Sequence, residues 1–220
     1  MIAGLLFVLI VAIEPLYEDP LELWSIKTLI PWLQKMSTEN KDILSFVSWI
    51  LDEGILFVSL MFFAFFNRAS ALYVLGSYAV INGLIVFMKM AYADGRPYMM
   101  DPSLDASRAC SDTSFGNPSG HTSRALSLFV LQYLEFFNEN SVKGVSHQLQ
   151  EKAQAIPLRP GVYEQMQSSV LWKTIFMTLL VVVTSILALS RIVVAAHTLN
   201  QVMFGAMVGT ALPLWWYYLT

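Results

Sequence analysis

Hydrophobic residues in this sequence gather into long segments that are separated by polar stretches. A helix that crosses a membrane needs about 20 predominantly apolar residues. Five segments approach or exceed that length: 43–66, 72–91, 122–137, 170–189 and 199–219. The segment 1–13 is also apolar, and no positively charged region precedes it as in a signal peptide. We expect it to form a sixth span, so the pattern predicts an all-α integral membrane protein with a six-helix bundle.

Three polar stretches connect these segments. In 14–42 the apolar residues recur at roughly helical spacing, which predicts a helix near residues 20–36 that lies in the membrane interface. The stretch 92–118 is rich in Asp, Ser, Pro and Gly and is typical of a loop. The stretch 138–169 has mixed charge and predicts a solvent-facing loop, which could also bind a protein partner. We expect residues 1–220 to form one membrane-embedded domain.

Composition and charge agree with this interpretation. The chain is 56% hydrophobic and 13% charged, whereas soluble domains carry roughly 25% charged residues. The net charge of −3, without any basic cluster, gives no indication of a nucleic-acid partner. The single cysteine, Cys110, cannot form an intrachain disulfide, so it leaves the redox compartment open. Membrane lipids are therefore the expected surroundings of this chain.

Polar residues form three clusters where the predicted spans meet one side of the membrane. The first is Lys89 followed by Arg96, and the second is the sequence Pro-Ser-Gly-His at 118–121. The third is Arg191 followed by His197. Six spans place the connections 14–42, 92–118 and 191–198 on one side, and 138–169 with both termini on the other. We therefore expect the three clusters to converge.

The cations and small residues of these clusters suit the binding of a phosphoryl group. A phosphoryl group in transfer spreads negative charge over its oxygens, and catalysis depends mostly on positioning and charge stabilisation. Lys89, Arg96 and Arg191 supply positive charge, and arginine donates in a bidentate manner. Ser119 and Gly120 lie at a predicted helix N-terminus, where free backbone N–H groups favour an anion.

Two histidines complete the chemistry. One imidazole, of His121 or His197, can attack phosphorus while the other protonates the leaving oxygen. Each residue taken singly also has an ordinary interpretation, since a lysine at the end of a span often extends to the interface and a buried histidine can be a core residue. The acidic residues show no metal-ligand spacing, so this hypothesis requires neither a metal nor another cofactor.

The spacing Lys-x6-Arg-Pro, Pro-Ser-Gly-His and Ser-Arg-x5-His resembles the type 2 phosphatidic acid phosphatase (PAP2) superfamily, from about residue 43 to the C-terminus. That superfamily includes lipid phosphate phosphatases, glucose-6-phosphatases and vanadium haloperoxidases. The resemblance implies a six-helix core and metal-independent hydrolysis of a phosphomonoester through a phosphohistidine. Local sequence around Gly95–Tyr98 and Leu189–Ile192 is most similar to the glucose-6-phosphatase branch.

By position, the resemblance implies that His197 is the nucleophile and His121 the general acid. It also implies that phosphate is bound by Lys89, Arg96, Ser119, Gly120 and Arg191. Most members carry Asp four residues after the nucleophile, where this chain has Gln201. One helical turn separates Gln201 from His197, so the amide can accept the imidazole N–H and orient the ring. It stabilises an imidazolium less than a carboxylate does.

The expected substrate is a phosphate-bearing lipid or a small molecule such as a sugar phosphate. Two alternatives stay open: a non-catalytic PAP2-fold subunit of a larger membrane complex, or a phosphotransferase that uses the same phosphoenzyme. Outside the motifs, five basic residues lie on the side of the termini and four on the site side. This small excess favours cytosolic termini. The resemblance implies the same orientation, with the site facing the lumen or exterior of a membrane such as the endoplasmic reticulum.

Overall fold

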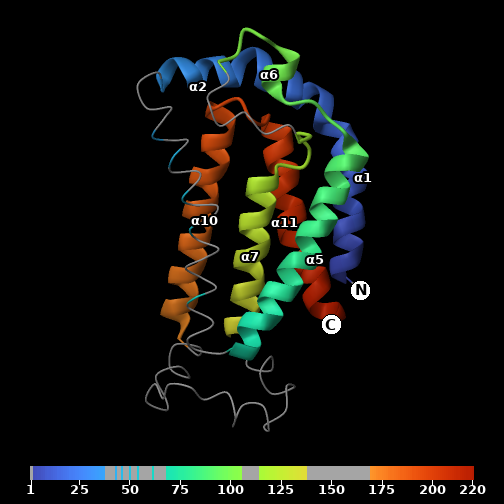
Figure 1. Ribbon diagram of the computed structural model, residues 1–220, viewed down its shortest axis with the longest axis vertical. Coiled ribbons are helices and arrows are strands. Elements are labelled where there is room, and N and C mark those ends of the chain that lie inside the picture. Colours follow the sequence, from blue (N-terminus) through green and yellow to red (C-terminus); the bar gives the residue numbers. More distant parts are fainter. Residues whose placement is uncertain are drawn as a thin grey trace.

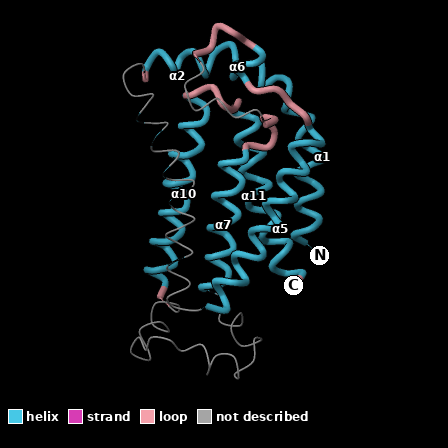
Figure 2. Tube along the Cα trace, viewed as in Figure 1, coloured by secondary structure: helices cyan, strands magenta, loops and turns pink. Residues whose placement is uncertain are grey.

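The computed structural model describes residues 2–37, 68–105, 114–137 and 169–220, and the single positions 43, 46, 50, 54 and 61. Helices account for most of this part, and it contains no β-strand (Figures 1 and 2). The helices are α1 (Ile2–Trp24), the π-helix η1 (Ser25–Leu29), α2 (Ile30–Met36), α5 (Arg68–Tyr92), α6 (Pro97–Met100), α7 (Gly120–Phe137), α10 (Val170–Val193) and α11 (Leu199–Leu219). The predicted all-α fold is confirmed.

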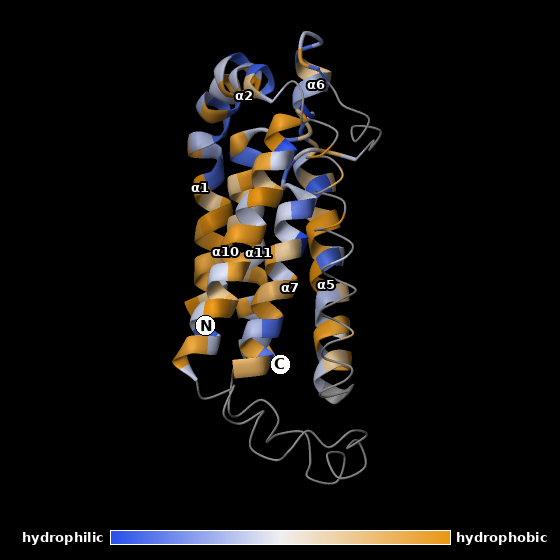
Figure 3. Cartoon of the chain, turned by 90° about the vertical axis from the view of Figure 1, so that its left-hand side faces the viewer, coloured by the Kyte–Doolittle hydropathy of each residue, from blue (hydrophilic) through white to orange (hydrophobic). Residues whose placement is uncertain are grey.

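Within the described part, three segments are long and apolar enough to cross a membrane. They are Ser70–Met100, which contains most of α5 and all of α6, together with α10 and α11. The spans expected at 72–91, 170–189 and 199–219 therefore have helical counterparts. Hydrophobic residues predominate along the length of α1, α10 and α11, whereas more hydrophilic residues lie around α2 (Figure 3). The span expected at 43–66 lies outside the described residues, apart from single positions.

Helix α7 occupies the segment expected as a span at 122–137, but it is less apolar than the three segments that are long and apolar enough to cross a membrane. It packs against α5, α10 and α11, and much of its surface is buried. Its small polar side chains bond to backbone oxygens, as Ser123 Oγ does to Ser119 O at 2.8 Å and Ser127 Oγ to Gly209 O at 3.2 Å. The polar residues lower the hydropathy of α7 because the helix faces protein and not lipid.

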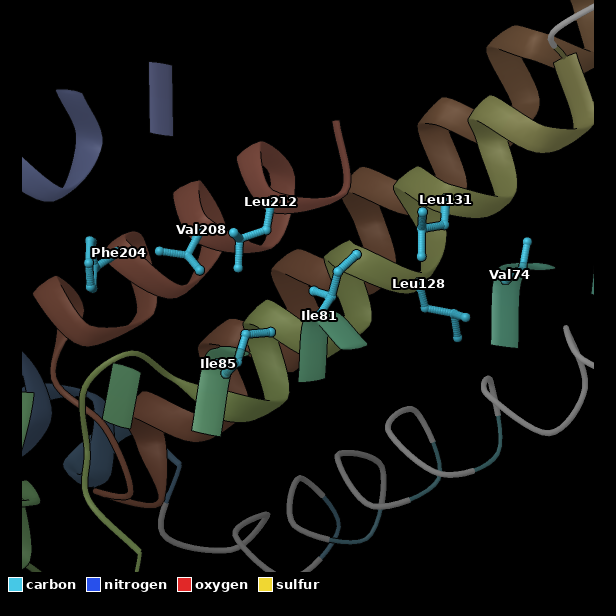
Figure 4. Packing of buried hydrophobic residues seen from close by; sticks show 8 residues of the cluster. All are labelled: Val74, Ile81, Ile85, Leu128, Leu131, Phe204, Val208 and Leu212. Carbon is cyan, nitrogen blue, oxygen red and sulfur yellow. The ribbon is translucent and has the colours of Figure 1, made fainter. Parts of the chain in front are cut away.

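A shared apolar core joins α5, α7 and α11 (Figure 4). Its buried members are Val74, Ile81, Ile85, Leu128, Leu131, Phe204, Val208 and Leu212. The ring of Tyr92, at the end of α5, packs on Phe204 with centroids 5.1 Å apart. This core fixes the three helices whose ends carry most of the polar motifs.

Small residues let α7 and α11 approach closely. A Cβ atom added to Gly205 would lie 2.8 Å from Ser119 O, and one added to Gly209 would lie 2.5 Å from Ser123 O. Glycine and serine at such crossings allow helix backbones to come together in membranes. The approach holds the Pro-Ser-Gly-His segment against the first turns of α11.

Replacing Gly209 by alanine should therefore destabilise the fold. The new methyl group would meet the backbone of Ser123, and overpacking of this kind costs about 1–3 kcal/mol. The thermal unfolding midpoint of the purified protein in detergent should fall by several degrees. Gly76→Ala is the matched control, because nothing lies within 4 Å of a Cβ atom at that position. An equal midpoint in both variants would contradict the close approach.

The N-terminal segment runs along the bundle and then crosses one end of it. Helix α1 packs on α11, where the rings of Phe7 and Trp215 stack with centroids 6.4 Å apart. The chain is helical through 20–36, although residues up to Trp24 belong to α1 and only η1 and α2 follow. Helix α2 lies across the end of the bundle near α6, and both chain ends lie toward the opposite end (Figure 1). The predicted loop 138–169 lies outside the described residues except for Ser169.

Candidate active site

The three motif segments meet at the α2 end of the bundle. The backbone N–H of Gly116 donates to Asp94 O at 2.9 Å, which joins the loop after α5 to the loop before α7. The N–H of Ser119 donates to Gln201 O at 2.9 Å, which joins the loop before α7 to α11. The Gln201 side chain reaches back to the first loop, donating from Nε2 to Gly95 O at 2.9 Å. These contacts close a ring of three segments that are far apart in sequence.

Arg96 is fully buried between two of these segments. It lies just before α6, which begins with Pro97 at its first position, as is common for helix starts. Its Nε donates to Ser114 O at 2.7 Å and its Nη2 to Ser114 Oγ at 2.8 Å, while Nη1 lies 3.5 Å from Ala196 O. The guanidinium is thereby fixed beside the turn that carries His197.

Lys89 lies in the last turn of α5 and next to the start of α7. Its Nζ donates to Phe115 O at 2.8 Å. A Cβ atom added to Gly120 would lie 3.1 Å from Lys89 Cε and 3.4 Å from Nζ. The absence of a side chain at Gly120 therefore leaves room for the lysine beside the N-terminus of α7.

A tight turn carries His197 from α10 to α11. Helix α10 ends at Val193, and the N–H groups of Ala196 and His197 both donate to Arg191 O, at 3.0 and 3.2 Å. Ala195 adopts a positive φ of 53°, which is unfavourable for a residue with a Cβ atom. This turn keeps Arg191 and His197 together, both buried.

The side chain of Gln201 contacts the His197 ring. Helix α11 begins with a capping box, in which the N–H of Thr198 donates to Gln201 Oε1 at 3.3 Å. The same oxygen lies 3.3 Å from His197 Nδ1, while Gln201 Nε2 donates to Gly95 O. Because Oε1 is the acceptor in this network, Nδ1 carries the proton and Nε2 carries the lone pair. Nε2 is buried without a hydrogen-bond partner among the described residues.

His197 lies between α10 and α11, in a strongly positive environment. Burial lowers its pKa well below the ordinary value, and the charges of Arg96, Lys89, Arg191 and His121 lower the pKa further, in that order. The neutral imidazole is therefore the stable form near neutral pH. A neutral ring with a free Nε2 lone pair is the form that can act as a nucleophile.

The Pro-Ser-Gly-His segment leads directly into α7. Ser119 is fully buried, its Oγ lies 3.2 Å from Thr122 Oγ1, and its carbonyl accepts from Ser123 N at 3.0 Å. Gly120 and His121 form the first positions of α7, where backbone N–H groups lack partners within the helix. The structure thus places the N-terminus of α7, with its backbone N–H groups, beside Lys89.

Motif spacing did not identify several residues that contact this arrangement. A Cβ atom at Gly116 would lie 2.5–2.8 Å from the amide atoms of Gln201, so only glycine leaves space for that side chain. Arg124 Nε donates to Gly120 O at 3.1 Å, one turn into α7. Glu14 contacts Asn117 from α1. Arg124 was an available signal, because it is a charge inside the apolar segment 122–137, whereas Glu14 stood among the acidic residues of the polar stretch 14–42.

No group of three or more His, Cys, Asp or Glu side chains in the described ranges is arranged to hold a metal ion. That catalysis needs no metal stays a prediction.

Comparison with known proteins places this arrangement in a family. The sequence model of the PAP2 superfamily matches residues 70–220. No curated protein matches the chain significantly. The fold is similar to the crystal structure of a transmembrane PAP2-type phosphatidylglycerolphosphate phosphatase from Bacillus subtilis. The TM-score is 0.65 and the identity 14%, over 99% of this chain and 94% of that chain. With its apolar helices, the chain is a multi-pass membrane protein, and it belongs to the PAP2 superfamily.

Proposed function

We propose that this protein is a membrane phosphatase that hydrolyses a phosphomonoester through a phosphohistidine at His197. The observation that carries the proposal is the His197 ring, which is fully buried with Nδ1 against Gln201 and Nε2 without a hydrogen-bond partner in the described part. Three cations, of Lys89, Arg96 and Arg191, lie close enough to lower its pKa. Family membership supports the same activity class.

The residues can divide the reaction into two steps. His197 Nε2 attacks phosphorus, and the new P–N bond forms as the bond to the leaving oxygen breaks, with a proton supplied by His121. Water then attacks the phosphohistidine, gives a proton to His121, and breaks the P–N bond to release phosphate. The cations and the N-terminus of α7 stabilise the charge on the phosphoryl oxygens in both steps.

The position of Gln201 argues against the non-catalytic alternative. The family Asp is replaced by Gln201, but the amide oxygen lies 3.3 Å from His197 Nδ1, where an orienting acceptor is needed. The substitution therefore leaves the ring oriented for attack, which favours a catalytic protein. Hydrolysis and phosphotransfer share the first step, and only the acceptor, water or an alcohol, distinguishes them.

Phosphate release from the full chain in detergent tests the proposal. Substrates should include phosphatidate, a sphingoid-base phosphate, a polyprenyl diphosphate and glucose 6-phosphate, each with and without an added alcohol. We expect release from a lipid phosphate or the sugar phosphate, inhibition by vanadate and no loss of activity in EDTA. Activity that EDTA removes and magnesium restores would contradict the metal-independent mechanism. Absence of release from every substrate would favour the non-catalytic subunit.

The acidic limb of the pH–rate profile should lie well below pH 6.5, the ordinary pKa of histidine. The active form of His197 is neutral, and its lowered pKa keeps it neutral until the pH falls far below that value. Lys89→Met removes one of the charges that lower this pKa, so the limb should move to higher pH. The profiles of kcat/KM for wild type and variant, taken with the same substrate, measure the shift. Identical acidic limbs would show that Lys89 does not act on His197.

A further inference from the structure

The N-terminal segment 2–36 lies outside residues 70–220, which match the family model, yet it contacts the loops of the candidate site. Asn117 Nδ2 donates to Glu14 Oε1 at 2.7 Å. Gln34 Nε2 donates to Val193 O at 3.1 Å, at the start of the His197 turn. Ser25 Oγ accepts from Leu199 N at 3.1 Å, just after that turn.

We propose that Glu14 is a positioning residue of the active site, which acts through Asn117 on the Ser119–His121 segment. This inference rests on the proposed function, because it assigns Glu14 a part in the same reaction. Glu14 touches no reacting atom in this arrangement. Its effect passes through the loop that begins α7.

Burial makes the contact unusual for a membrane helix. Glu14 and Asn117 are both 0% exposed. A buried carboxylate is expensive unless it is hydrogen-bonded, and an apolar side chain would serve simple packing at less cost. Glu14 Oε2 and Asn117 Oδ1 have no hydrogen-bond partner within the described ranges, so the single Nδ2–Oε1 contact links the two side chains. Ionisable residues inside membrane proteins are commonly functional.

The position of Asn117 explains how the contact reaches the site. The loop is held at Gly116 by Asp94 O and at Ser119 by Gln201 O, both at 2.9 Å. Glu14 of α1 binds Asn117, which lies between Gly116 and Ser119. Without the acceptor, Asn117 Nδ2 would be a buried donor with no partner, and the loop would shift to satisfy it. Such a shift would displace His121, which follows four residues later.

Ser25 and Gln34 extend the same role to the second loop. Gln34 also accepts from Asp105 N at 3.2 Å and donates to Asp105 O at 2.9 Å, so it joins the end of the α6 loop to the His197 turn. Ser25 belongs to the π-helix η1, and such helices occur frequently at functional sites. The segment therefore contacts both loops that carry the proposed histidines.

The first test compares Glu14→Leu, Glu14→Gln and the exposed control Asp19→Asn in the full chain. Glutamine keeps an acceptor oxygen and leucine does not. Glu14→Leu should lower kcat about 10–100-fold, by analogy with other positioning partners, while Glu14→Gln and Asp19→Asn stay within about threefold of wild type. The loss should be larger for an alkyl phosphate than for p-nitrophenyl phosphate, whose leaving group needs no proton from His121. A reduced fraction of folded protein would lower both rates by the same factor.

A donor–acceptor exchange supplies the second test. Asn117→Asp places two carboxylates together and should lower kcat. Glu14→Gln combined with Asn117→Asp restores the hydrogen bond with the roles reversed, so the double variant should be more active than Asn117→Asp alone. Two results would overturn the proposal. In the first, the losses of kcat in the two single variants simply add in the double variant. In the second, Glu14→Leu loses the same factor in kcat for both substrates. If the wild type releases no phosphate, or if His197→Ala keeps activity, the proposed function fails instead.

Discussion

Replacing His197 by alanine should abolish phosphate release and prevent any phosphoenzyme from forming. The variant lacks Nε2, which is buried without a hydrogen-bond partner among the described residues while Nδ1 lies against Gln201. Removal of a nucleophile that forms a covalent intermediate lowers kcat on the order of 10⁴-fold or more. The measurement is turnover in detergent, together with covalent labelling by a radioactive phosphate ester that is quenched at alkaline pH.

The label should be stable to base and labile to acid, as a phosphohistidine is. His147→Ala, which changes the third histidine of the chain outside the motifs, is the matched control and should label like wild type. His121→Ala should still label from p-nitrophenyl phosphate, and the label should persist because water then lacks its base. A base-stable, acid-labile label that survives in His197→Ala would assign the nucleophile elsewhere.

Length and apolarity predicted two of the long apolar helices well. Helices α10 and α11 match the segments 170–189 and 199–219 closely, because membrane spans must satisfy their backbone within the helix. The extent of α1 was harder to predict, since Pro15 and Pro20 lie inside it and the chain stays helical through both. Proline is tolerated in membrane helices when neighbouring groups satisfy the freed backbone. The polarity of the sequence alone therefore predicted an end for α1 that is too early in the chain.

That the motif residues lie near one another could be predicted because their spacing is local, whereas their roles in catalysis stay predictions. The His197–Gln201 contact follows from one turn of helix, and the structure places Nδ1 and Oε1 3.3 Å apart. The contacts of Gly116 with Gln201 and of Glu14 with Asn117 join residues 85 and 103 positions apart. No periodicity records such tertiary contacts, so the sequence could not distinguish Glu14 from the other acidic residues of the polar stretch 14–42.

The same tertiary contacts change what Gln201 does. The sequence predicted an acceptor for the imidazole N–H. In the structure the amide also donates to Gly95 O at 2.9 Å and accepts from Thr198 N at 3.3 Å. It therefore joins the Arg96 loop, the His197 ring and the start of α11. A carboxylate at this position would place an oxygen against Gly95 O, so the amide fits the surrounding groups and fixes which end faces His197.

Replacing Gln201 by alanine should lower kcat about 100-fold and raise KM by much less, by analogy with other partners that orient a histidine. The ring would lose the acceptor that keeps the proton on Nδ1, so a smaller fraction would present a free Nε2 lone pair. Because Gln201 touches the nucleophile and not the phosphate, the loss belongs to the chemical step. The control is Gln132→Ala, which removes another buried glutamine, within α7. It should leave kcat within about threefold of wild type, as for residues outside a site. If Gln201→Ala turns over like Gln132→Ala in a protein that His197→Ala inactivates, another group sets the His197 tautomer.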